Sequence, residues 1–167
     1  SRKIQQLGYR RRYNMNSEEL KNIIRKDKFL KNIFMGIYAC DEIHNLYKTE
    51  RPTLFIANTD PSSMTGQHWV AFYTNGKTVE YFCSYGIQPF VLEFKAFLTH
   101  FKNIKINTVR LQSSHSKVCG LYCIYYMYHK SRGKTLCRFI HRVFGIHTKV
   151  CCNNTQKCKS LTETKGL

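Results

Sequence analysis

A strand-turn-strand pattern near the middle of the chain constrains the fold more than any other feature. Two runs rich in β-branched and aromatic residues, His68–Thr74 and Thr78–Cys83, flank the dipeptide Asn75-Gly76. Asn-Gly tolerates the positive φ angles that a tight turn needs. The sequence therefore predicts an antiparallel β-hairpin over residues 68–83.

Four segments carry the apolar spacing or the end signals of helices. They are residues 17–26, with Ser17 as the expected N-cap, residues 90–101, residues 119–130, and residues 136–144, which Gly145 is placed to end. The longest apolar run, Cys119–Tyr128, reaches about half of the roughly 20 residues that a membrane span needs. We therefore interpret it as part of a central buried helix and expect no membrane partner.

Further strands are expected on either side of the hairpin. Residues 53–58 are rich in β-forming residues, and residues 104–111 begin with an alternating pattern. Residues 29–40 are apolar but irregular, with Gly36 as a breaker, so no element is assigned to them. Helix, strands, helix, strand and helices follow one another without a regular βαβ alternation, so the predicted fold class is α+β.

The length of 167 residues allows one domain with one core. The predicted elements place this domain at residues 17–145. Residues 1–16 carry five basic side chains and no periodicity, so they are interpreted as a basic N-terminal arm. Residues 146–167 have little apolar content and are expected to form a loose C-terminal tail.

The net charge and the cysteine content restrict the partners and the cellular compartment that we expect. The chain has 27 Lys+Arg against 10 Asp+Glu, a formal net charge of +17, which favours contact with a polyanion such as nucleic acid. No apolar signal segment precedes the eight cysteines, so reduced thiols in an intracellular protein are expected instead of a disulfide framework. His147, Cys151, Cys152 and Cys158 lack the paired Cys-x-x-Cys knuckles of a zinc site, and no metal is predicted.

Cys119 is a candidate nucleophile because it opens a predicted helix after a polar loop. The positive field of a helix N-terminus is expected to lower the pKa of its thiol, and Gly120 would allow a close approach of backbone and substrate. A thiol nucleophile needs a base, and His68, which opens a strand after a long loop, is the natural candidate. A single histidine or buried cysteine is more often structural than catalytic, so a wider pattern of motifs is needed to identify an active site.

Three motifs supply that pattern: Gly66-Gln67-His68-Trp69-Val70, then residues 81–86 (YFCSYG), then Gln112 followed by residues 119–123 (CGLYC). With these motifs, the chain resembles the adenovirus-type (adenain-like) cysteine proteases of the viral and Polinton (Maverick) group, within the ubiquitin-like-protease superfamily. Gln112 precedes Cys119 by seven residues, the separation of the family's oxyanion glutamine and nucleophile. The resemblance spans residues 20–133. It implies a central, mostly antiparallel sheet flanked by helices, with the nucleophile at the N-terminus of a buried helix.

The resemblance also implies roles for individual residues. Cys119 is the nucleophile, His68 its base, Trp69 a wall of the site, and Gln112 donates with the Cys119 N–H to the oxyanion of acyl transfer. The implied substrate is a polypeptide, either a viral or transposon precursor or a ubiquitin-like protein. The implied enzyme is a monomer of the nucleus or virion that requires no cofactor and takes DNA as an activating polyanion.

One departure from the family is serious, because Cys83 stands where the family has an Asp or Glu. That acid holds the imidazole and stabilises its charged form. Glu80 points to the opposite face of its strand and does not replace it. Loss of the acid costs a serine triad about 10⁴ in turnover. A thiolate–imidazolium pair depends less on the acid, so the prediction is a weakened protease.

Two alternatives stay open. A basic DNA-binding domain would explain the charge without any special role for His68, Gln112 and Cys119. A catalytically degenerate relative, kept as a DNA-binding or protein-interaction domain, would explain Cys83.

Overall fold

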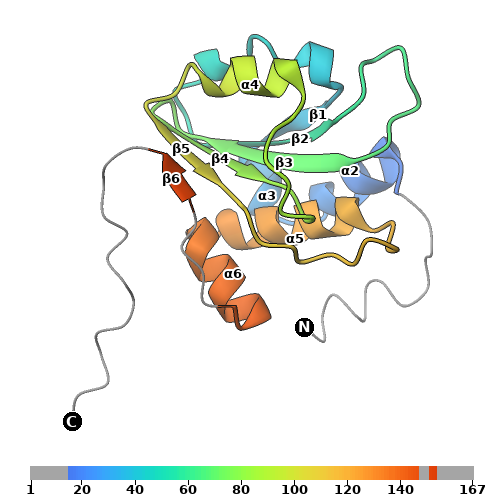
Figure 1. The fold of residues 1–167 in the computed structure, drawn as a ribbon, viewed down its shortest axis with the longest axis vertical. Coiled ribbons are helices and arrows are strands. Elements are labelled where there is room, and N and C mark those ends of the chain that lie inside the picture. The colour runs from blue at the N-terminus through green and yellow to red at the C-terminus, as the bar shows by residue number, and fades with distance from the viewer. Residues whose placement is uncertain (1–14, 147–150, 154–167) are drawn as a thin grey trace.

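The computed structural model describes residues 15–146 and 151–153, and a six-stranded sheet forms its middle layer (Figure 1). The strands lie in the order β1-β2-β3-β4-β5-β6. Their bounds are β1 Phe34–Tyr38, β2 Thr53–Asn58, β3 Trp69–Thr74, β4 Thr78–Phe82, β5 Asn103–Ile106 and β6 Cys151–Asn153. Strand β1 runs parallel to β2, and β4 runs parallel to β5, while the other three pairings are antiparallel. The sheet is therefore mixed, and most of its pairings are antiparallel, as expected.

The predicted hairpin is confirmed as β3 and β4. Ala71 pairs with Phe82 and Thr74 with Val79 in an antiparallel register. Gly76 has a φ of 82°, in the region that glycine adopts without strain. The Asn75 side chain accepts a hydrogen bond from the Thr78 N–H at 2.9 Å, which closes the turn.

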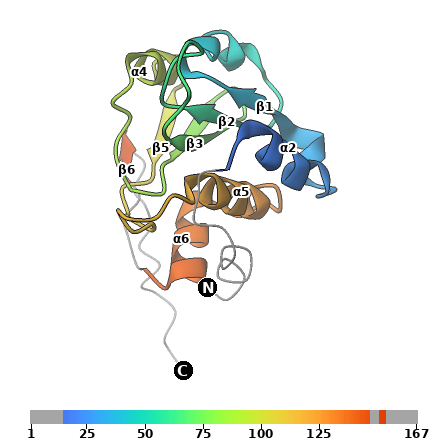
Figure 2. The same ribbon diagram turned by 90° about the vertical axis from the view of Figure 1, so that its right-hand side faces the viewer.

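Helices cover both faces of the sheet. Helix α4 (Leu92–Leu98) and the short 3₁₀ turns η1 (Cys40–Glu42) and η2 (Leu46–Lys48) lie on one side. The opposite side carries α2 (Ser17–Arg25), α3 (Leu30–Ile33), α5 (Cys119–Lys130) and α6 (Leu136–Phe144). Figures 1 and 2 both show α4 across the sheet from α5 and α6. The arrangement is an α+β fold with the sheet between two helical layers.

Alternation along the strands divides the apolar core in two. In the hairpin, Ala71 and Phe82 pack toward α2, α5 and α6, whereas Phe72 and Tyr81 pack toward α4. This two-residue period is what a sheet buried on both faces requires. Cys83 continues the pattern and belongs to the α4 side.

The domain begins earlier than residue 17. Asn16, not Ser17, caps α2, and it forms a reciprocal capping box with Glu19, whose carboxylate accepts the Asn16 N–H at 3.1 Å. Met15 is buried, and its carbonyl accepts a hydrogen bond from the indole of Trp69 at 2.9 Å. Residues 15 and 16 are thus part of the folded domain, and residues 1–14 of the predicted arm lie outside the described residues.

Helices α5 and α6 match their predicted bounds, whereas several other elements differ from prediction. Residues 34–38, left without an element, form β1 at the sheet edge. Helix α4 is shorter than residues 90–101, and Phe90 at the start of the expected apolar stripe is 58% exposed. Strand β5 ends at Ile106, short of the predicted residue 111, and the side chain of Asn107 then bonds to the Val109 N–H and to the Cys83 carbonyl.

The C-terminal segment was expected to be loose. For residues 151–153 that prediction is wrong, because they pair with β5 as strand β6. The remainder of the predicted tail, apart from residue 146, lies outside the described residues. Among the described helices, none is long and apolar enough to cross a membrane.

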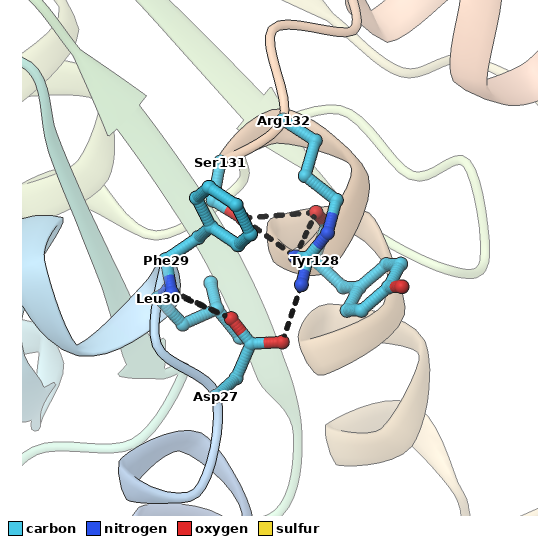
Figure 3. Close-up of polar contacts among 6 residues, drawn as sticks. All are labelled: Asp27, Phe29, Leu30, Tyr128, Ser131 and Arg132. Carbon is cyan, nitrogen blue, oxygen red and sulfur yellow. Dashed lines mark hydrogen bonds and ion pairs between the residues drawn. The ribbon is translucent and has the colours of Figure 1, made fainter.

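An ion pair ties the turn between α2 and α3 to the end of α5 (Figure 3). The Arg132 guanidinium donates to the Asp27 carboxylate at 2.6 Å and to the Tyr128 carbonyl at 3.0 Å. Its carbon lies 3.5 Å from the ring centroid of Tyr128 and 4.6 Å from that of Phe29. A planar cation stacked between two rings and hydrogen-bonded in this way fixes the relative position of the two helices.

Candidate active site

The hairpin brings His68 and Cys83 together at one end of the sheet. His68 directly precedes β3 and Cys83 directly follows β4, and antiparallel pairing places these two positions at the same end. His68 Nε2 lies 3.3 Å from Cys83 Sγ. The position that the resemblance gives to an acid thus contacts the imidazole, but it carries a thiol.

Cys119 enters the same region from the first turn of α5. Its side chain is buried, and the backbone N–H of Trp69 lies 3.5 Å from its Sγ. Cys119 and His68 both line a pocket of about 510 Å³. The complete lining is Gln67, His68, Tyr85, Ser114, His115, Ser116, Lys117 and Cys119. Two residues that are far apart in the sequence therefore face one cavity.

Gln112 is buried behind this pocket and is held by hydrogen bonds. Its Oε1 accepts from the Ser84 hydroxyl at 2.6 Å. Its Nε2 donates to the Ser116 carbonyl at 2.8 Å and to the Tyr85 hydroxyl at 3.1 Å. Both amide protons are engaged, so Gln112 can serve an oxyanion only by exchanging one of these acceptors.

Trp69 does not have its expected place as a wall of the pocket, and it is not among the lining residues. Its indole N–H donates to the Met15 carbonyl, and the side chain lines a second pocket of about 280 Å³ beside the loop of residues 58–66. The contact of Trp69 with Cys119 is made by its backbone N–H. The tryptophan indole thus anchors the N-terminal segment.

Gly120 packs tightly inside the domain. A Cβ at this buried position would lie 2.8 Å from Leu20 Cδ2 and 3.3 Å from Trp69 Cδ1. The close approach that glycine permits here is between α5 and the side chains of α2 and β3.

Burial sets the protonation of the catalytic candidates. It lowers the pKa of His68 to about 4 and raises the pKa of the Cys119 thiol. Hydrogen bonds from the backbone N–H groups of Trp69, Gly120 and Cys119 act in the lowering direction without overcoming burial. The N–H groups at the helix N-terminus thus lower this pKa as predicted, but burial outweighs them and the net shift is upward. At neutral pH the resting pair is a neutral thiol and a neutral imidazole.

At His68 Nε2, the position of the missing acid is filled by the uncharged Cys83. The pKa of Cys83 is also raised by burial, so it remains a neutral thiol. The Glu80 carboxylate lies on the other face of the sheet, where Tyr126 Oη and Lys130 Nζ each donate to it at 2.8 Å. This placement agrees with the prediction that Glu80 does not substitute for the acid.

Several residues at the site were missed from the sequence. Tyr85 and Ser84 fall inside the second motif and Ser116 in the polar loop before Cys119, but no residue pattern shows that all three would bind Gln112. His115, in the same polar loop, also lines the pocket. Their roles depend on the loops that bring residues 84–85 and 112–116 together.

A metal centre finds no support in the part of the chain whose side chains are described. Residues 15–146 contain no group of three or more His, Cys, Asp or Glu side chains arranged to hold a metal ion. The side chains of His147, Cys151, Cys152 and Cys158 lie outside that part.

Comparison with known proteins gives little beyond this geometry. No family model matches the chain, and no curated protein matches it. A similar solved structure is the selenomethionine crystal structure of the ASFV pS273R protease, at 20% sequence identity and a TM-score of 0.47. The match covers 81% of this chain and 64% of that chain. This chain therefore spans less than two thirds of the length of that protease.

Proposed function

We propose that the protein is a cysteine-type endopeptidase of the adenain-like kind, with Cys119 as nucleophile and His68 as base. The observation that carries the proposal is the shared pocket of these two side chains at the N-terminus of α5. The contact of His68 Nε2 with Cys83 supports it, because Nδ1 is then the ring nitrogen that takes the thiol proton. Gln112, behind the pocket, is the proposed oxyanion donor.

In the proposed reaction, His68 takes the proton of Cys119, and the sulfur attacks the carbonyl carbon of the scissile peptide bond. The carbonyl π electrons move to oxygen, and hydrogen-bond donors stabilise the resulting oxyanion. The C–N bond then breaks, and His68 returns the proton to the leaving amine. Water, deprotonated by His68, attacks the thioester, and Cys119 leaves with the proton restored.

The proposed enzyme is slow, because forming the reactive ion pair is unfavourable. Neutral Cys119 must give its proton to a histidine whose pKa is about 4. Cys83 offers no charge to the imidazolium. Nucleophilic attack therefore depends on proton transfer at the moment of reaction, and turnover is expected to be lower than with an acidic residue at position 83.

Active-site labelling tests this function. The full chain is treated with a peptide vinyl sulfone that ends in Gly-Gly, and the modified residue is located by mass spectrometry. We expect labelling at Cys119, abolished in Cys119→Ala and at least about tenfold slower in His68→Ala. His115→Ala is the matched control, because it removes an exposed histidine of the same pocket. Equal labelling of the wild type and His68→Ala would show that the two residues do not act together.

The neutral state of the pair also favours a second candidate, a catalytically degenerate relative that acts as a basic DNA-binding or protein-interaction domain. In that case Cys119 shows no labelling beyond that of an ordinary buried thiol. Salt-sensitive DNA binding would persist in Cys119→Ala, because phosphate contacts do not involve the thiol. The labelling experiment therefore separates the two candidates.

A further inference from the structure

Two hydrogen-bond donors converge on the carbonyl oxygen of a residue that lines the pocket of the candidate nucleophile. The Ser116 carbonyl accepts from Gln112 Nε2 at 2.8 Å and from Tyr85 Oη at 2.9 Å. Gln112 Nε2 also donates to Tyr85 Oη at 3.1 Å, so the three groups form a closed triangle. Ser116 and Tyr85 line the pocket that contains Cys119.

The surrounding contacts fix both donors. Ser84 holds the Gln112 amide through Oε1, and the Ser84 carbonyl accepts the backbone N–H groups of Leu111 and Gln112 at 2.8 and 3.0 Å. The Tyr85 ring centroid lies 5.0 Å from that of His68. Gly86 follows with a φ of 67°, and a Cβ there would lie 2.5 Å from the Val109 backbone, so the two loops are closely packed.

We propose that Tyr85 is a second oxyanion donor that acts together with Gln112, and that the Ser116 carbonyl occupies the acceptor position of the oxyanion in the substrate-free protein. This inference rests on the proposed function, because it assigns a role within acyl transfer.

The count of donors and acceptors supports this assignment. Gln112 has two amide protons, one on Tyr85 and one on Ser116, and Tyr85 has one hydroxyl proton, which lies on Ser116. If a substrate oxygen replaces the Ser116 carbonyl, both donors turn to it and no other hydrogen bond of the triangle has to change. Two preorganised donors on one oxygen are the arrangement that stabilises a tetrahedral intermediate.

The properties of the two partners fit the exchange. Burial raises the pKa of the Tyr85 hydroxyl, so it stays protonated and able to donate. Ser116 is flanked by the exposed residues His115 and Lys117, so its carbonyl can turn to water when a substrate displaces it. The phenol is a chemically suitable donor because its proton points to where negative charge develops.

Tyr85→Phe is the decisive variant, since it removes the donor and keeps the ring beside His68. Three properties of this variant, made in the full chain, are compared with those of the wild type. They are kcat and KM for a fluorogenic Gly-Gly peptide, inhibition by a Gly-Gly peptide aldehyde, and alkylation of Cys119 by iodoacetamide. Hydrolysis and aldehyde binding both pass through a tetrahedral adduct whose oxygen needs hydrogen-bond donors, whereas alkylation by iodoacetamide forms no such adduct.

We expect Tyr85→Phe to lower kcat by about 10- to 100-fold at nearly constant KM, to weaken aldehyde binding by a similar factor, and to leave alkylation within about twofold. Tyr122→Phe is the control, because its hydroxyl donates to the Leu111 carbonyl, next to Gln112, from outside the pocket. All three readouts should remain within about threefold of wild type in that variant.

Other outcomes overturn the inference in recognisable ways. An unchanged kcat in an active enzyme would show that Tyr85 is not a donor. A parallel fall in alkylation would show that Tyr85 acts through His68 or through folding. If the wild type neither hydrolyses peptides nor reacts with the vinyl sulfone at Cys119, the proposed function itself fails, and the role of Tyr85 fails with it.

Discussion

At the scale of single residues, Cys83 controls how well His68 can become charged. Its thiol lies 3.3 Å from His68 Nε2, so Cys83→Asp would place a carboxylate at the same nitrogen. The carboxylate stabilises the imidazolium and raises the pKa of His68 from about 4. We expect hydrolysis of the Gly-Gly peptide to rise by about 10- to 1000-fold, measured as kcat/KM.

Cys83→Asn is the matched control, because it offers a hydrogen-bond acceptor of similar size without the charge, and it should give a much smaller gain. The pH dependence of alkylation by iodoacetamide gives a second readout. In the wild type, burial raises the pKa of the Cys119 thiol above its ordinary value, so the alkylation rate should still be rising with pH at about pH 9. In Cys83→Asp a reactive plateau should appear near neutral pH. A variant with wild-type activity and pH profile would exclude Cys83 as the cause of low reactivity.

At the scale of elements, the contact of α5 with α2 depends on Gly120. A methyl group there would lie 2.8 Å from Leu20 Cδ2, and Leu20 is fully buried. We expect Gly120→Ala to lower the free energy of unfolding by about 1–3 kcal/mol through overpacking. In a Leu20→Ala background, the same substitution should cost at least about 1 kcal/mol less, because the clashing atom is absent. Urea denaturation of the four proteins gives this coupling, and additive costs would place the strain elsewhere.

The ion pair of Arg132 with Asp27, between the α2–α3 turn and the end of α5, should make the stability depend on pH. Burial raises the pKa of Asp27, but the hydrogen bonds from Arg132 and from the Leu30 and Phe29 N–H groups together outweigh it, so the pKa is lowered. A lowered pKa in the folded state means that the contribution is present above the ordinary carboxyl range and is lost as the pH falls through the folded pKa. Asp27→Asn should therefore cost about 1–2 kcal/mol at pH 7 and almost nothing near pH 2.

Urea unfolding at the two pH values measures this difference. Glu18→Gln is the control, because Glu18 makes an exposed pair with Lys21 and should change the stability by less than about 0.5 kcal/mol. A cost of Asp27→Asn that is independent of pH would show that the ion pair is not its source.

The same elements show how far the sequence could predict the structure. The β3–β4 hairpin and helices α5 and α6 were predictable, because turn chemistry, capping and apolar spacing agree in those segments. Strand β1 was missed because Gly36 interrupts its pattern and its pairing with β2 is a long-range contact. At the site, the motifs single out His68 and Cys119 as candidates, but the pKa shifts and the Gln112 contacts depend on burial and on loops from distant parts of the chain.

At the scale of the whole molecule, the chain carries a formal net charge of +17. We propose that DNA is a partner and an activating polyanion of the enzyme, which would then work in a nucleus or a virion. Described basic residues such as Lys26, Lys28 and Lys31 are exposed around α2 and α3 and are available to phosphates.

This proposal predicts that the full chain binds duplex DNA with strong salt dependence. If about four to eight phosphates are neutralised, the logarithm of the binding constant should fall with the logarithm of salt at a slope of about −4 to −7. Fluorescence anisotropy between about 50 and 200 mM NaCl measures the slope, and Cys119→Ala should leave it unchanged. Peptide hydrolysis by the wild type should rise when DNA is added at low salt and lose this gain at high salt. Binding without salt dependence would exclude a phosphate-contacting surface, and binding without a gain in hydrolysis would leave DNA as a tether that does not activate the enzyme.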